Sequence, residues 1–120
     1  MRVLIVEDDA IIAMHLAMVE FGHEVCATAR SAAGAISLAT AHSPDVVLMD
    51  IRLAQGTSGV DAAREIHAQQ GLRCIFLSAN LDEATRTALL PCQPIAFVGK
   101  PVLPSVLQRA LKKADGVTDL

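Results

Sequence analysis

Val46-Val47-Leu48-Met49-Asp50 is the stretch that decides the fold, because four apolar residues run directly into a carboxylate. Three other apolar runs also end on polar groups. Val3–Val6 is followed by Glu7-Asp8-Asp9, Ile75–Leu77 by Ser78, and Ile95–Val98 by Gly99-Lys100. Short, continuous apolar runs of this kind are typical of strands that are buried on both faces of a parallel sheet.

Segments with helical character separate these runs, and each has a recognisable start or end. The first is Ala10–Phe21, with Gly22 as its C-cap, and the second is capped by Ser31, runs to about His42 and is stopped by Pro44. The third starts at Ser58-Gly59-Val60-Asp61, which has the spacing of a capping box, and ends before Gly71. The fourth is a short helix, Leu81 to about Leu90, capped by Asn80 and ended by Pro91, and the fifth begins at Pro104.

Apolar positions assign a buried face to two of these helices. The third is expected to bury Val60, Ala63 and Ile66, and the fifth carries the stripe Val106, Leu107, Ala110, Leu111 and Ala114. The shorter and more polar run Glu24–Ala27 is expected at a sheet edge, and Cys74–Leu77 is the fourth strand. Five strands that alternate with five helices predict an α/β doubly wound sheet, as a single domain over residues 1–120 with a frayed tail from 115 to 120.

Composition excludes several classes of protein. The chain has 120 residues, is 52% hydrophobic and carries a formal charge of −3, which favours one compact domain over a disordered or DNA-coating segment. It contains no Trp, no Tyr and three Phe, so base stacking on nucleic acid is not expected. No apolar stretch has the length of a membrane span, and Met1-Arg2 leads directly into a strand. The three cysteines are widely spaced, which suits small buried thiols in a reducing cytoplasm. The four histidines are scattered, which suits solvated imidazoles.

Polar groups follow four of the predicted strands, and parallel strands bring their carboxyl ends to one edge of the sheet. Glu7, Asp8 and Asp50 would then form a cluster of like charges that a hard divalent cation such as Mg²⁺ neutralises. Lys100 adds a positive charge suited to a phosphoryl oxygen, and Ser78 adds a hydroxyl. One carboxylate left to attack phosphorus would make an aspartyl-phosphate site.

Each motif also has a plainer interpretation when it is taken alone. An acid after a strand is commonly a helix cap or a solvated loop residue. Glu7-Asp8-Asp9 could simply favour the N-terminus of the first helix through its dipole, and Lys100-Pro101 could be an ordinary turn. The joint occurrence of these groups on four strand ends favours the functional interpretation.

At these residues the chain resembles the receiver domain of the response regulators of bacterial two-component signal transduction. The resemblance rests on four motifs in the expected order, namely Leu4–Asp9, Val47–Asp50, Phe76–Ala79 and Phe97–Pro101. It implies a flavodoxin-like sheet with strand order 2-1-3-4-5. It also implies a cytoplasmic signalling module rather than an enzyme, apart from its own phosphorylation and dephosphorylation.

The resemblance assigns a role to each site residue. Asp50 would accept a phosphoryl group from a phosphohistidine. Mg²⁺ would be held by Glu7, Asp8, Asp50 and the backbone carbonyl of Arg52. Lys100, Ser78 and the backbone of Ala79 would bind the phosphoryl oxygens, and Ser78 with Phe97 would form the conformational switch. Arg52 and Asn80 would flank the path of hydrolytic water and set the phosphate lifetime, and Lys100-Pro101 is a candidate for a cis peptide bond.

The same resemblance names the partners. A sensor histidine kinase or a histidine phosphotransfer protein would donate the phosphoryl group. An output partner would bind the face formed by the fourth helix, the fifth strand and the fifth helix, and homodimerisation is also compatible with it. No direct nucleic-acid contact is expected, because too few residues follow the last helix for a helix-turn-helix.

Four features depart from the common receiver pattern. Ala54 stands where many receivers have proline, and the loop from Asp50 to Gly59 is one residue longer. Phe97 replaces a frequent tyrosine, and Pro91 with Pro94 shortens the fourth helix.

Two other functions compete with the signalling switch. One is a receiver fold that works without phosphate, as an interaction module. The other is a small Mg²⁺-dependent phosphatase that passes through an aspartyl-phosphate. Against the phosphatase, position 52 is arginine where hydrolases of the haloacid-dehalogenase type have a second acid.

Overall fold

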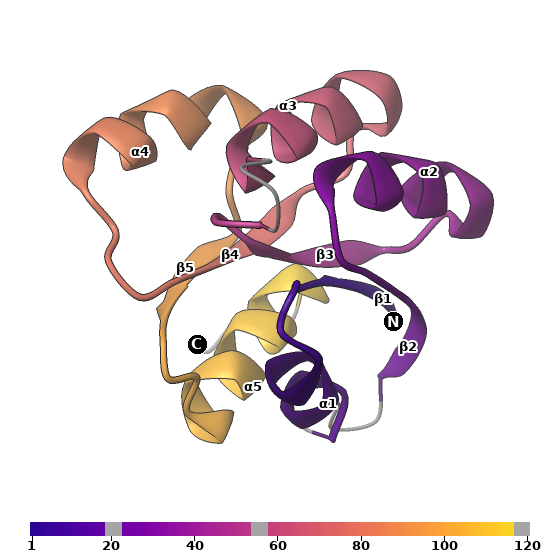
Figure 1. The fold of residues 1–120 in the computed structure, drawn as a ribbon, viewed down its shortest axis with the longest axis vertical. Coiled ribbons are helices and arrows are strands. Elements are labelled where there is room, and N and C mark those ends of the chain that lie inside the picture. The colour runs from indigo at the N-terminus through magenta and orange to yellow at the C-terminus, as the bar shows by residue number, and fades with distance from the viewer. Residues whose placement is uncertain (19–22, 54–57, 117–120) are drawn as a thin grey trace.

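The computed structural model describes residues 1–18, 23–53 and 58–116, and over these residues it is a three-layered α/β domain (Figure 1). The strands are β1 (Arg2–Val6), β2 (Glu24–Ala29), β3 (Val46–Asp50), β4 (Cys74–Ser78) and β5 (Ala96–Gly99). The helices are α1 (Ala10–Met18), α2 (Ala32–His42), α3 (Gly59–Gln70), α4 (Glu83–Leu89) and α5 (Pro104–Ala114).

The five strands form one parallel sheet in the order β2-β1-β3-β4-β5, so the predicted fold and strand order are confirmed. β3 lies at the centre, and all five of its residues are buried. The more polar β2 lies at the edge, as predicted, and extends two residues beyond the predicted end, to Ala29.

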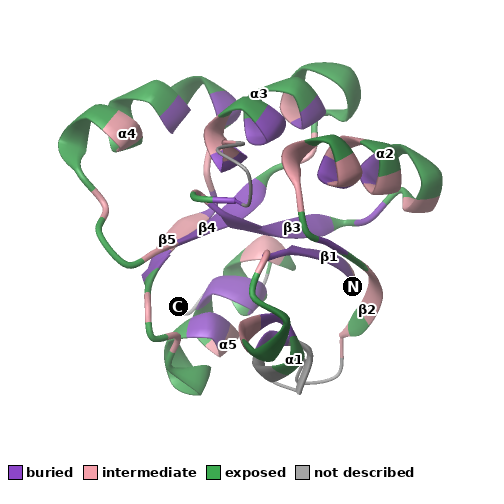
Figure 2. Ribbon diagram, in the orientation of Figure 1, coloured by how far each residue is buried: buried purple, intermediate pink, exposed green. Residues whose placement is uncertain are grey.

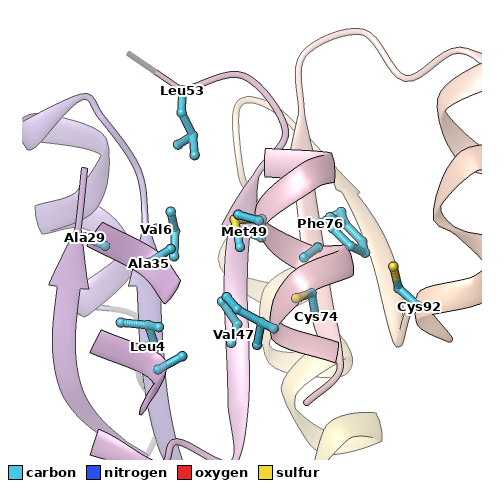
Figure 3. Packing of buried hydrophobic residues seen from close by; sticks show 14 of the residues in the cluster. Leu4, Val6, Ala29, Ala35, Val47, Met49, Leu53, Cys74, Phe76 and Cys92 are labelled. Carbon is cyan, nitrogen blue, oxygen red and sulfur yellow. The ribbon is translucent and has the colours of Figure 1, made fainter. Parts of the chain in front are cut away.

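Helices cover both faces of the sheet, with α1 and α5 on one side and α2, α3 and α4 on the other (Figures 1 and 2). Because successive residues of a strand point to opposite faces, each buried strand contributes to two cores. Leu4 and Val6 of β1 join the cluster under α2, α3 and α4, which Figure 3 shows from close by, whereas Val3 and Ile5 join the cluster under α1 and α5. This double burial explains why the strands are continuous apolar runs.

Two helix starts follow the predicted capping chemistry. The hydroxyl of Ser31 accepts a hydrogen bond from the backbone N–H of Gly34 at the start of α2. The hydroxyl of Ser58 accepts hydrogen bonds from the N–H groups of Val60 and Asp61 at the start of α3. Gly71 ends α3 in the left-handed conformation that glycine adopts without a steric cost.

The fourth helix begins later than predicted. Asp82, not Asn80, is its N-cap, with a carboxylate oxygen 2.7 Å from the N–H of Thr85. The backbone N–H of Asn80 donates to the hydroxyl of Ser78, in the turn that precedes the helix. The α-helix ends at Leu89, and Pro91 lies inside a following 3-10 helix, Leu90–Cys92, instead of directly ending α4.

The predicted apolar faces of α3 and α5 need two corrections. Ala62 is fully buried in α3, although its face was predicted from Val60, Ala63 and Ile66. On α5, Leu107, Ala110 and Leu111 are buried, but Val106 is exposed. With about 100° of rotation per residue, Val106 falls at the margin of the stripe that the other residues define.

The remaining boundary predictions fall partly outside the described residues. The end of the first helix beyond Met18, its Gly22 cap, the positions of Ala54 and Gly56, and the tail from 117 to 120 all lie there. Over the residues that are described, no helix combines the length and the apolar character needed to cross a membrane.

Candidate phosphoacceptor and metal site

The polar groups at the four strand ends lie around one cavity of about 330 Å³. Glu7 follows β1, Asp50 ends β3, Ser78 ends β4 and Lys100 follows β5. The strand register brings these ends together, because Asp50 pairs with Leu77 and Ser78 pairs with Gly99. The lining residues are Glu7, Asp8, Asp9, Ile12, Asp50, Arg52, Ser78, Ala79, Asn80 and Lys100.

Asp50 is the acid that ends the central strand, and it is only 4% exposed. One of its carboxylate oxygens, Oδ2, lies 3.0 Å from Nζ of Lys100. The other, Oδ1, accepts a hydrogen bond of 3.1 Å from the backbone N–H of Arg52. The carboxylate is therefore fixed in orientation by two donors while it still borders the cavity.

Glu7 shares the same ammonium group. Its Oε2 lies 2.9 Å from Nζ of Lys100, and its Oε1 accepts from the N–H of Asp9. The pKa of Glu7 is raised to about 7, chiefly by burial. The hydrogen bond from Lys100 opposes this rise, and the nearby charge of Asp50 adds to it. Burial lowers the pKa of Lys100, but the hydrogen bonds and charges of Glu7 and Asp50 together outweigh burial, so the net pKa is raised. One ammonium thus serves two buried acids.

Glu7, Asp8 and Asp50 each offer a carboxylate oxygen, and these atoms all lie within 4.8 Å of one another. Three clustered carboxylates near one lysine leave an excess of negative charge. Hard oxygen donors of this kind are the ligands that Mg²⁺ prefers, and Mg²⁺ binds through few protein oxygens while it keeps several waters. The donor set therefore fits Mg²⁺, and Arg52 borders the same cavity.

Ser78 borders two cavities, and the predicted switch residue Phe97 borders only the second. This second cavity, of about 200 Å³, lies on the α4 side of the strand ends. The Phe97 ring stacks on Phe76, with 5.7 Å between the ring centroids, and the guanidinium of Arg86 lies 4.8 Å from the Phe97 centroid. The structure thus brings Ser78 and Phe97 to a shared space, and it adds Arg86, which no sequence motif indicated.

Three further residues support the site. Asp9 caps α1 by accepting from the N–H groups of Ile11 and Ile12, so the plainer interpretation holds for this acid. Arg30 donates a hydrogen bond of 3.3 Å to the backbone carbonyl of Asp8. Gly59 lies against the backbone of Asp50, at a distance that leaves no room for a side chain. The sequence had indicated a role at the helix terminus for the acids that include Asp9, whereas the contacts of Arg30 and Gly59 were not identified, because they depend on tertiary structure.

Two further features concern the backbone around the site. The Lys100–Pro101 peptide bond is cis, the isomer that the resemblance had suggested. The loop after Asp50 closes through an isolated bridge between Arg52 and Ser58 and a hydrogen bond from the N–H of Gly59 to the carbonyl of Ile51. Ala54, the departure from the receiver pattern, lies outside the described part of this loop.

A model of the response regulator receiver domain matches residues 3–112. Since this match covers most of the chain, the protein belongs to the response regulator receiver domain family. The family assignment made from the four motifs is therefore confirmed.

Particular relatives place the chain within that family. It is 35% identical to the phyllosphere-induced regulator PhyR of Methylorubrum extorquens over 116 residues, which cover 94% of this chain and 43% of PhyR. It is 36% identical over 119 residues to the transcriptional regulatory protein PdtaR of Mycobacterium tuberculosis, with 94% and 56% covered. The chain thus spans about half the length of these relatives.

A solved structure agrees with the fold at similar identity. The signal receiver domain of a modulated diguanylate cyclase from Desulfovibrio desulfuricans G20 superposes with a TM-score of 0.85 and 30% identity, covering 94% of this chain and 91% of that one. This agreement supports the receiver fold over nearly the whole chain.

Proposed function

We propose that Asp50 accepts a phosphoryl group from a phosphohistidine, and that the modified domain then presents a changed surface to an output partner. The observation that carries this proposal is the placement of Asp50: a buried carboxylate at the end of the central strand, 3.0 Å from the Lys100 ammonium and bordering a cavity lined by three more acids.

In the proposed transfer, a carboxylate oxygen of Asp50 attacks the phosphorus of the donor. An O–P bond forms, the N–P bond of the phosphohistidine breaks, and the leaving imidazole nitrogen keeps the bonding electron pair and takes up a proton. The hydrogen bond from the Arg52 N–H orients the attacking carboxylate. Lys100 is placed to pair with the incoming phosphoryl oxygens, where a preorganised positive charge lowers the barrier.

Glu7, Asp8, Asp50 and the backbone carbonyl of Arg52 would hold Mg²⁺ in this proposal. The clustering of the three carboxylates supports the first three assignments, and the position of Arg52 at the cavity supports the fourth. When bound, Mg²⁺ supplies positive charge for the phosphoryl oxygens. Lys100, which pairs with Glu7 and Asp50 in this structure, would pair with the phosphoryl oxygens.

The readout proposed for this site uses Ser78 and Phe97. The Ser78 hydroxyl and the Ala79 backbone would hydrogen-bond the phosphoryl oxygens, and Phe97 would rotate toward the space that Ser78 leaves. Their common cavity supports this pairing. The rotation would change the face formed by α4, β5 and α5, where an output partner or a second copy would bind.

Arg52 and Asn80 are proposed to set the lifetime of the phosphate. Both border the cavity, and both are exposed, so each can alter the approach of water to the phosphoryl group. This role is tested by replacing each residue singly with alanine and following the dephosphorylation of each variant. Unchanged rates in both variants would contradict it.

The donor would be a cytoplasmic sensor histidine kinase or histidine phosphotransfer protein, as the family implies. The first test needs no knowledge of that donor. The protein is incubated with Mg²⁺ and acetyl phosphate, and the intact mass is measured beside D50N. We expect a gain of one phosphoryl group that requires Mg²⁺ and is absent in D50N. No adduct with rapid quenching, together with no binding of beryllofluoride, would favour the phosphate-independent interaction module.

A further inference from the structure

The ring of Phe97 is held by two partners that lie on different elements. Phe76 is its direct neighbour across the β4–β5 pair, and the two rings stack with an interplanar angle of 24°. Arg86 approaches from α4, with its guanidinium carbon 4.8 Å from the centroid of the ring. A guanidinium at this distance is attracted by the negative face of the ring. The ring is therefore fixed from the sheet and from the helix that covers it.

The surroundings of Arg86 leave this contact unopposed. Among the residues that the structure describes, the ion pairs involve Arg2 and Lys100, and no carboxylate lies within 4.0 Å of the Arg86 guanidinium. Glu83, one turn earlier on α4, is exposed and does not pair with it. Arg86 is also the only basic residue within α4.

The cavity beside the ring provides space into which the Phe97 side chain can rotate. It is bordered by the ring itself, by Arg86, and by Ser78, whose hydroxyl also borders the phosphoacceptor cavity. A ring that rotated toward Ser78 would lose the present geometry, in which the guanidinium lies 4.8 Å over the ring centroid. The Arg86 contact therefore opposes this movement, because it stabilises only the position in which the ring lies beneath α4.

We propose that Arg86 is a positioning residue that restrains Phe97 in its resting orientation and couples rotation of the ring to α4. This inference rests on the proposed function, since it names the residue against which the Ser78–Phe97 switch would work. A side chain that favours one of two ring positions changes their ratio by its differential interaction. For a partly exposed cation–π contact this amounts to about a twofold to fivefold change in population.

The first test examines the contact in the unphosphorylated protein by NMR. The side-chain protons of Arg86 should be shifted upfield by the ring current of Phe97, and F97L should abolish that shift. R86Q, which removes the charge and keeps most of the chain length, should change the rotamer populations of Phe97 measured from side-chain couplings. An unshifted Arg86, or identical Phe97 couplings in R86Q, would overturn the proposal.

The second test measures consequences for the switch. If phosphorylation by acetyl phosphate uses the rotated ring, R86Q should be modified about twofold to fivefold faster than the wild type, with unchanged Mg²⁺ affinity. R64Q removes a charge from another exposed arginine, on α3, and should have no effect. In the F97L background the acceleration by R86Q should disappear, because the ring is the proposed partner.

Equal acceleration in both backgrounds would assign Arg86 a general electrostatic role and overturn the proposal. The two tests also separate this inference from the proposed function. If the wild type takes up no phosphoryl group, the proposed function fails, and the NMR measurement still decides whether Arg86 restrains the ring.

Discussion

Replacing Gly59 with alanine should destabilise the protein through a backbone collision directly behind the candidate phosphoacceptor. Gly59 is the first residue of α3, and its N–H donates to the carbonyl of Ile51 at 2.9 Å. A Cβ at this position would lie 2.0 Å from the carbonyl oxygen of Asp50, and 2.9 Å from both the carbonyl carbon of Asp50 and the Cα of Ile51. All three atoms belong to the backbone, so no rotamer change can relieve the contact.

The magnitude follows from two opposing effects. Real Cβ atoms do not approach such neighbours within 3.0 Å, so the helix start and the strand end must separate by about 1.0 Å. Overpacking costs about 1–3 kcal/mol, and alanine returns up to about 1 kcal/mol in a helix. Because the clash is entirely with backbone, we expect a net loss of about 2 kcal/mol, which lowers the Tm by about 8 °C for a domain of this size.

Urea and thermal unfolding of G59A and the wild type measure this loss, and G34A provides the matched control. Gly34 lies in α2, where a Cβ would meet only the Ser31 hydroxyl oxygen at 3.2 Å and the Ala29 Cβ at 3.8 Å. These are side-chain atoms, so G34A should be close to neutral or stabilising by up to about 1 kcal/mol. If G59A were as stable as the wild type, the close approach of α3 to Asp50 would not be a constraint of this fold.

Three more predictions concern other parts of the domain. In the metal-free protein, the raised pKa of Glu7 means that its contribution to stability is present below the ordinary value of 4.5 and is lost as the pH rises through about 7. Urea unfolding in EDTA should therefore show a free energy of unfolding that is lower at pH 8 than at pH 5, and this difference should be smaller in E7Q. D82A should lower the Tm and N80A should not, because Asp82 caps α4; equal effects would contradict the observed helix start. Burial raises the pKa of the Cys74 thiol to about 12, so at pH 8 a thiol reagent should modify half-buried Cys26 in the folded protein and reach Cys74 only after denaturation.

The fold was predictable because its strongest signals are local and repeated. β1, β3 and β4 are apolar on both faces, and this pattern indicates a parallel sheet before any pairing is known. The capping hydroxyls of Ser31 and Ser58 also act within a few residues. The start of α4 was less predictable, because Asn80 and Asp82 are both good caps and lie only two residues apart; the structure uses Asp82.

The residues proposed to perform the chemistry could be identified from the sequence, since each comes directly at the end of an apolar run. Asp50 and Lys100 are of this kind, and the sheet brings them to 3.0 Å without help from any other motif. The residues that support the site through tertiary contacts are different. Gly59 and Arg86 act across elements, one by lacking a side chain and the other by reaching a ring on β5.

The charged groups of the candidate site carry an electrostatic cost in the metal-free fold. The site concentrates three carboxylates around a single ammonium, and two of those acids are almost fully buried. Such an arrangement is costly for the metal-free fold, as the raised pKa of Glu7 indicates, and burial of like charges is a common feature of functional sites. The cost falls if a divalent cation binds, so the features that destabilise the resting site are the same ones that favour Mg²⁺ and a transferred phosphoryl group.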